Sequence, residues 1–393
     1  MAEPDTPRVA ALRGHVRQAA VGLREIGLEI DRDPTAIDRW LDLPAVHIMS
    51  GCTIPPEYLE SPLRVDGHTY DMSSCLEHTV TIEELSYGDA SFMLACPGPI
   101  MSGVTVGALG DDRQRDAYYR RMAAPEPVWT FFGLTEPGKG SAATELETVL
   151  EPDGDGFRLT GEKRYVGNAA FAELGVVFCR RAPGPLGIEA VLLDTDTPGF
   201  HAEVIPTVGM RGVRISAITL DHVRVEREQI LGFETRKPSR RGLIGAIQTL
   251  QRFRPVLTGT AVGLCRAVLD HVRAQRPALH GAARRRLAEA QDRVEAVRQH
   301  NYAVASAVDA GRIRADRIAG VKTRAAELAE RCTLLAAELL GPAALLEDPL
   351  LDKWYRDARA IEFMEGTGHI QRLAVFQGVL KGTFLDRAAA AGA

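Results

Sequence analysis

The stretch Leu134-Thr135-Glu136-Pro137-Gly138-Lys139-Gly140-Ser141 places a sharp turn directly after an apolar run. The Pro-Gly-x-Gly segment turns the chain where a strand ends, and it exposes backbone N–H groups and hydroxyls at the edge of a sheet. Such groups suit the carbonyls of a planar ring and a phosphate-bearing tail. Taken alone, the stretch also fits an ordinary β-turn. Its meaning therefore depends on the sequence around it.

Short apolar or alternating runs surround this stretch, from Val128 to Leu231. Glycine, proline and Asp-Gly pairs separate them, which is typical of strands joined by tight turns. The pattern predicts an antiparallel sheet unit of about a hundred residues. The predicted strands span residues 128–134, 156–166, 174–180, 188–193 and 215–225.

Helical periodicity dominates on both sides of the predicted sheet. Residues 8–27 and 74–122 precede the sheet as helices, and residues 43–73 between them have no long period and predict loops and short turns. A polar linker at 232–241 is followed by five helical segments, which need a bundle to bury their faces. These segments span 242–275, 283–310, 313–340, 348–362 and 368–380. The prediction is an α+β protein with a helical domain at 1–127, a β domain at 128–232 and a helical bundle at 233–393.

Composition excludes several classes of protein. The chain has 393 residues, 45% of them hydrophobic, and a net charge of −5, which argues against a dedicated nucleic-acid binder. Its six cysteines form no C-x-x-C pair and its histidines do not cluster, so we predict reduced thiols and no metal site. The acidic start predicts no signal peptide, and no apolar run reaches the ~18 residues of a membrane span. We therefore expect a cytoplasmic protein with no membrane partner.

Four separated segments resemble the acyl-CoA dehydrogenase family in the order and spacing of that family. Together they span about residue 75 to 380, and each alone would be weak support. The four segments are residues 134–141 with Gly161–Asn168, Gly209–Gly212 with Leu220–Val225, Arg254-Pro255 with Gly259–Leu264, and Trp354–Arg359 with Glu365–Thr367 and Ile370–Arg372. The resemblance implies the fold of that family, FAD as the cofactor and an acyl thioester as the substrate.

The resemblance also implies two groups of cofactor-binding residues. Thr135 is expected at the isoalloxazine ring, and Tyr165 stands where the family has an aromatic residue, usually tryptophan. Gly167 replaces the threonine that usually binds flavin N5. The ring group is Leu134, Thr135, Gly140, Tyr165, Val166 and Gly167, and the remaining cofactor residues are Arg276, Glu338, Gly341, Thr367 and His369.

The adenosine diphosphate half of FAD is usually bound across a dimer interface in this family, so we expect a homodimer or homotetramer. Arg276 matches the arginine that pairs with the pyrophosphate. Glu338 replaces a glutamine, and a carboxylate beside phosphates would repel them by about 1 kcal/mol or more unless it is paired. His369 likewise replaces a glutamine.

Glu365 is the predicted catalytic base. Removing the α-proton of a thioester needs a carboxylate in a nearly dry pocket, where its pKa rises towards neutrality. Some family members place the base near Arg254 instead, but Gln251 to Arg254 include no acid. Arg254 is expected to tune the charge of the pocket. Gly366 is expected to let the chain leave a helix end and aim the carboxylate into a cleft. Gly366 itself is expected to lie beside the substrate.

The predicted function is FAD-dependent α,β-dehydrogenation of an acyl thioester, with the α-proton passing to Glu365 and the β-hydride to flavin. Ser141 and Gln251 are the other expected substrate contacts. The thioester is either acyl-CoA or acyl-carrier protein, and the basic linker Arg236–Arg241 is a candidate contact for an acidic carrier. Electrons pass to an electron-transfer flavoprotein or to oxygen. The alternatives are a flavin-dependent monooxygenase or oxidase on the same fold and a non-catalytic scaffold that has lost flavin.

Overall fold

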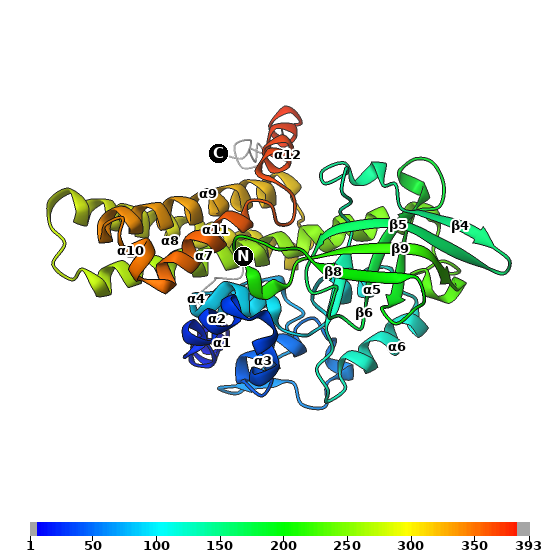
Figure 1. Ribbon diagram of the computed structural model, residues 1–393, viewed down its shortest axis with the longest axis horizontal. Helices are drawn as coiled ribbons and strands as arrows, with labels where there is room; N and C mark the ends of the chain where they lie inside the picture. Colours follow the sequence, from blue (N-terminus) through cyan, green and yellow to red (C-terminus); the bar gives the residue numbers. More distant parts are fainter. Residues whose placement is uncertain (1–5, 383–393) are drawn as a thin grey trace, which may run out of the picture.

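The structure is a computed structural model that describes residues 6–382, and its elements follow the order helices, sheet, helices. In Figure 1 the sheet lies at one end of the molecule, the C-terminal helices extend away from it, and the N-terminal helices pack below both. The predicted α+β fold class is therefore confirmed.

The N-terminal region contains six α-helices among the described residues. They are α1 (Pro7–Ala19), α2 (Leu23–Arg32), α3 (Pro44–Gly51), α4 (Cys75–Ala95), α5 (Ile100–Leu109) and α6 (Asp112–Met122). The single helix predicted at 8–27 is interrupted, because Gly22 adopts φ 83° between α1 and α2. Helix α3 lies where loops were predicted. It is short and begins with Pro44, whose fixed φ suits a first helical position.

Within residues 6–382 the main sheet contains seven strands, and a separate hairpin of β1 (Leu63–Val65) and β2 (His68–Tyr70) precedes it. The sheet order is β3-β6-β4-β5-β9-β8, with β7 also paired to β6. Its strands are β3 (Thr130–Gly133), β4 (Val149–Asp153), β5 (Gly156–Val166), β6 (Leu174–Arg180), β7 (Ile188–Asp194), β8 (Phe200–Val204) and β9 (Ser216–Val225).

The prediction of a purely antiparallel sheet is wrong at two pairings, because β6 runs parallel to β3 and also to β4, where Val149 lies opposite Arg180. Strand β3 pairs with β6 in parallel, with Thr130 opposite Leu174 and Gly133 opposite Val177. The chain leaves β3 through a long loop and the β4–β5 hairpin before it returns, so β6 can run in the same direction as β3. Strands β4 and β8 were not predicted. Strand β4 contains Pro152 and acidic residues, and β8 is mostly exposed, so neither shows a clear alternation of apolar and polar residues.

The C-terminal region is helical, as predicted, and α7 packs against α4 at very short range. A Cβ atom added to Gly259 would lie 2.8 Å from the oxygen of Thr79, and one added to Gly263 would lie 2.3 Å from that of Glu83. The two glycines thus allow the helix backbones to touch. The helices are α7 (Leu243–Gln275), α8 (Gly281–Asp309), α9 (Ala315–Leu340), α10 (Ala344–Glu347), α11 (Pro349–Ile361) and α12 (Gly368–Leu380).

Candidate active site

The predicted base lies in the loop between α11 and α12, residues 362–367, which we call the base loop. Glu365 adopts φ 54° and Gly366 adopts φ 95°. Two consecutive residues in the left-handed region reverse the chain sharply, and such a conformation is costly for a residue with a side chain. The base loop therefore needs contacts from outside to hold this shape.

Side chains from three helices bind the backbone of the base loop. From α7, Arg254 Nε donates to the oxygen of Glu365 at 3.0 Å. From α12, Gln371 Nε2 donates to the same oxygen at 3.1 Å. From α9, Lys322 Nζ donates to the oxygens of Glu362 at 2.8 Å and Gly366 at 2.9 Å. The loop is thus anchored to the bundle from several sides.

The carboxylate of Glu365 is in an electrostatic environment that suits a base. Its Oε2 atom is buried and makes no hydrogen bond within the described residues, although other parts of the residue reach the surface. Burial raises the pKa of Glu365 to about 7, against the opposing effects of the positive charges of Arg254 and Lys322. A carboxyl with this pKa can take up and release a proton near neutral pH.

A buried ion pair anchors the turn at residues 134–141 to the sheet. Lys163 on β5 contacts Glu136 at 2.8 Å. The same carboxylate accepts hydrogen bonds from the backbone N–H groups of Glu147 at 2.6 Å and Thr148 at 2.9 Å. The Arg164 N–H donates to the oxygen of Thr135 at 2.9 Å. Leu134 and Thr135 are half-buried, whereas Gly140 and Ser141 are exposed. The turn therefore stands on a rigid base with an accessible edge.

Tyr165 is held outward from the sheet near that edge. The pairing of β5 with β9 shifts register between Lys163 and Val166, and Tyr165 adopts φ 60° within the shift. Its side chain is 62% exposed, while Val166 is buried. A Cβ added to Gly167 would contact only Val213 at 3.4 Å, so a larger residue is not sterically excluded there. The bulge therefore presents an aromatic face that suits a planar ring.

A second group of predicted residues lies at the far end of the bundle. Arg276, just after α7, donates from Nη2 to the oxygen of Leu340 at 3.1 Å, which places it at the end of α9 that also carries Glu338 and leads into Gly341. Arg286 on α8 forms an ion pair with Glu338. The negative charge of Glu338 is thus paired, the condition under which it need not repel phosphates. Glu338 is 16 residues from Lys322 on α9, or about 24 Å along the helix axis.

The remaining predicted residues have less defined surroundings. Gln251 is half-buried one turn before Arg254 on α7, and His369 is exposed at the start of α12. Thr367 precedes the first residue of α12, where the N–H of Gly368 donates to Glu362 Oε1 at 2.7 Å. The structure thus brings Arg254, Glu365 and Gly366 together. No hydrogen bond or ion pair among the described residues supports the role predicted for His369.

Two residues of the base-loop contacts were not predicted, namely Lys322 and Gln371. Gln371 lies in a family-like segment, Ile370–Arg372, but the sequence predicts no role for it. Lys322 could have been noticed by composition, because the chain has only six lysines among 47 basic residues. Three of these lysines, at 163, 322 and 353, are almost fully buried. Where arginine is so strongly preferred, a retained lysine indicates a site that needs a compact ammonium group.

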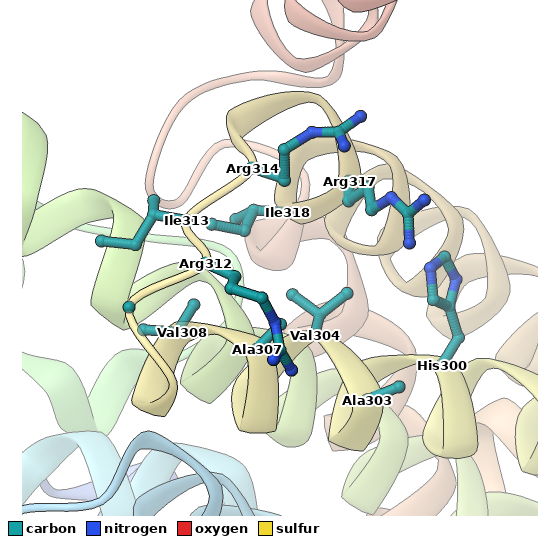
Figure 2. A pocket seen from close by; sticks show the side chains of 11 residues that line it. His300, Ala303, Val304, Ala307, Val308, Arg312, Ile313, Arg314, Arg317 and Ile318 are labelled. Atoms are coloured by element: carbon teal, nitrogen blue, oxygen red, sulfur yellow. The ribbon is translucent and has the colours of Figure 1, made fainter. Parts of the chain in front are cut away.

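A cavity of about 610 Å³ opens between the end of α8 and the start of α9. Figure 2 shows arginine side chains and His300 around an apolar floor. Burial, together with the charges of Arg317 and Arg324, lowers the pKa of His300. None of the predicted site residues lines this cavity, so it is separate from the base loop.

Within residues 6–382, no group of three or more histidine, cysteine or acidic side chains is arranged to hold a metal ion. In the same part of the chain, no helix combines the length and apolarity that crossing a membrane requires.

Comparisons with known proteins match most of the chain. The model for the middle domain of acyl-CoA dehydrogenase matches residues 131–223, and that for the C-terminal domain matches residues 240–380. The mitochondrial isovaleryl-CoA dehydrogenase of Pongo abelii is 27% identical over 320 residues, which cover 76% of this chain and 73% of the relative.

Two solved structures share the fold at low sequence identity. The prolyl acyl carrier protein oxidase AnaB has a TM-score of 0.81 and 22% identity, covering 95% of this chain and 99% of its own. The FAD complex of PigA has a TM-score of 0.78 and 20% identity, covering 94% of this chain and 97% of its own.

Proposed function

Because the chain belongs to the acyl-CoA dehydrogenase family, we propose that it uses FAD to introduce an α,β double bond into an acyl thioester. The strongest support is the burial and the raised pKa of the Glu365 carboxyl. Its Oε2 is buried without a hydrogen-bond partner in the described chain, and its pKa is raised to about 7. A buried carboxylate oxygen without a partner is costly unless a ligand uses it.

In the proposed reaction Glu365 accepts the α-proton of the thioester. The electron pair of the broken Cα–H bond forms the double bond as a hydride leaves the β-carbon. FAD, when bound, supplies the acceptor for that hydride. Arg254 and Lys322 oppose the effect of burial on Glu365, so that part of the carboxyl population is ionised and competent at neutral pH.

The residues around Tyr165 fit the ring of FAD. The exposed tyrosine offers an aromatic face, and the turn that follows Thr135 offers accessible backbone groups. We propose Leu134, Thr135, Gly140, Tyr165, Val166 and Gly167 as the ring contacts. Arg276, Glu338 and Gly341 lie together at the opposite end of the bundle, so we assign the adenosine diphosphate half there, on a second copy of the chain.

A second copy is consistent with the surface of α12. Leu373, Phe376 and Leu380 are exposed large hydrophobic residues at helical spacing on this helix, which Figure 1 shows standing out from the bundle. We propose a homodimer or a homotetramer. Light scattering coupled to size-exclusion chromatography distinguishes these, and a monomeric FAD-loaded protein would refute the proposed sharing of the cofactor.

The thioester carrier and the electron acceptor are finer points of the proposal. AnaB is named an oxidase of a carrier-linked prolyl group, which favours testing carrier-linked substrates and oxygen beside CoA and an electron-transfer flavoprotein. The basic linker Arg236–Arg241 has fewer free charges for binding a carrier protein than its sequence suggests. Arg241 is buried and contacts Glu189 at 2.9 Å, so it is not available to a carrier. Ser141 and Gln251 are the proposed substrate contacts besides Gly366.

The direct test is anaerobic mixing of the FAD-loaded protein with CoA- and carrier-linked acyl thioesters. Bleaching of the visible flavin absorbance without any nicotinamide is the expected result. Glu365→Gln should retain FAD and lose about 10²- to 10⁴-fold in the rate of bleaching. Glu347→Gln, which changes an exposed carboxylate on α10, should behave like the wild type. A protein that binds no FAD, or bleaching undiminished in Glu365→Gln, would overturn the proposal.

A further inference from the structure

Lys322 is buried in a way that an ordinary helix lysine is not. Its side chain is only 1% exposed, and its Nζ donates to two backbone oxygens, those of Glu362 and Gly366. Burying an ammonium group is strongly unfavourable unless its donors are satisfied. Here the compensation comes from carbonyl groups of the base loop.

The two carbonyls mark the two ends of the reversal that contains Glu365. Helix α11 ends at Ile361, so the oxygen of Glu362 lies at the negative end of a helix, where a cation is favoured. The oxygen of Gly366 follows the left-handed pair Glu365 and Gly366. One ammonium group therefore links Glu362, at the end of α11, to Gly366, the second residue of the left-handed pair.

We propose that Lys322 is a positioning residue for the base: by binding the oxygens of Glu362 and Gly366 together, it holds the base loop in the one conformation that presents the Glu365 carboxylate. The inference rests on the proposed function for the role of Glu365, but the effect on the loop can be measured without it. A non-glycine residue in the left-handed region is strained and persists only where its surroundings enforce it.

Three charged groups face Lys322, and they belong to two elements. Arg254 comes from α7, and Glu362 and Glu365 come from the base loop. Burial and Arg254 lower the pKa of Lys322, the two carboxylates raise it, and the net value is about 8. The ammonium form is thus present at neutral pH, where its charge also lowers the pKa of Glu365. Lys322 acts on the base through the backbone and through its charge.

The test compares Lys322→Met with Thr323→Val in the full-length, FAD-loaded protein. Methionine keeps the length of the side chain but removes both donors and the charge. Thr323 is the next residue on α9, and its Oγ1 bonds only within the helix, to the oxygen of Ala319 at 2.9 Å. Its substitution therefore perturbs the same turn of the helix without removing a hydrogen bond to the base loop.

The first measurement is hydrogen exchange of the peptide that covers residues 362–372. We expect exchange about 10-fold faster in Lys322→Met and unchanged in Thr323→Val. The second is the rate of anaerobic flavin reduction against pH. We expect a fall of roughly 10- to 100-fold at saturating thioester, a KM within about threefold of the wild type, and a midpoint at higher pH.

The outcomes separate the two ideas. Wild-type protein that no thioester reduces would refute the proposed function, while the exchange data would still test the loop. Wild-type exchange and wild-type reduction in Lys322→Met would overturn the role of Lys322. If Lys322→Met does not fold, Lys322→Gln retains a shorter, neutral donor. That variant should show intermediate exchange, and exchange equal to the wild type would count against the proposal.

Discussion

Arg254 acts on Glu365 in two ways, through a hydrogen bond to its backbone and through its charge. Its Nε donates to the backbone oxygen of Glu365 at 3.0 Å, and its positive charge opposes the rise that burial causes in the pKa of the Glu365 carboxyl. One guanidinium group thus orients the base and adjusts its proton affinity. The two residues are 111 positions apart in the sequence and come from different helical segments. The pH dependence of flavin reduction should therefore report on the interaction between Arg254 and Glu365.

The rate of flavin reduction should rise with pH through a midpoint near 7. The base must be ionised to accept a proton, and burial raises the pKa of Glu365 to about 7. The activity is therefore lost as pH falls below this value and levels off above it. Stopped-flow absorbance of the flavin over a series of buffers measures the profile. A midpoint near 4.5, the ordinary value for a glutamate, would show that the carboxylate is solvated during the reaction.

Substitutions of Arg254 should separate orientation from charge. Arg254→Gln removes the charge, so the pKa of Glu365 and the midpoint of the profile should move to higher pH. Arg254→Lys keeps a charge but loses the planar guanidinium that holds the backbone. Its midpoint should stay close to that of the wild type, while its limiting rate falls by about 10-fold or more. The same stopped-flow profiles measure both variants. Equal midpoints in the two variants would contradict a charge effect of Arg254.

The sequence predicts the elements well and their contacts poorly. The predicted limits of β5 and β6 agree with the structure because these strands alternate or are buried along their whole length. The parallel pairing of β3 with β6 could not be predicted, because a period of two residues does not identify a partner strand.

The same limit applies to the site. Glu365 and Arg254 were found because family motifs contain them. Lys322 stands on an amphipathic helix, where a lysine is usually solvated, and its burial depends on two carbonyls that lie about 40 residues further on. Helix periodicity cannot show such a contact.

The buried pair of Glu136 and Lys163 should be essential for stability. In Lys163→Met the carboxylate of Glu136 would stay buried without its cation, which costs about 3–5 kcal/mol. Adding Glu136→Gln should recover part of that loss. Lys139→Met is the control, because Lys139 lies in the same turn but makes a partly exposed contact with Glu145, worth less than about 1 kcal/mol. Urea unfolding measures all four proteins, and equal losses for Lys163→Met and Lys139→Met would contradict the prediction.

Two glycines within helices should respond to alanine in opposite directions. A Cβ on Gly263 of α7 would lie 2.3 Å from the oxygen of Glu83 on α4, so Gly263→Ala must push the helices apart and should destabilise the protein by about 1–3 kcal/mol. A Cβ on Gly320 of α9 would meet only Val375 at 3.8 Å, so Gly320→Ala should stabilise by up to about 1 kcal/mol through helix propensity alone.

Both substitutions change propensity equally, so the difference between them isolates the close approach of α7 to α4. Thermal unfolding of the two variants measures that difference. Because Arg254 lies on α7, Gly263→Ala should also slow flavin reduction, whereas Gly320→Ala should not. Stability and reduction rate unchanged in Gly263→Ala would mean that α7 can shift without moving Arg254 away from Glu365.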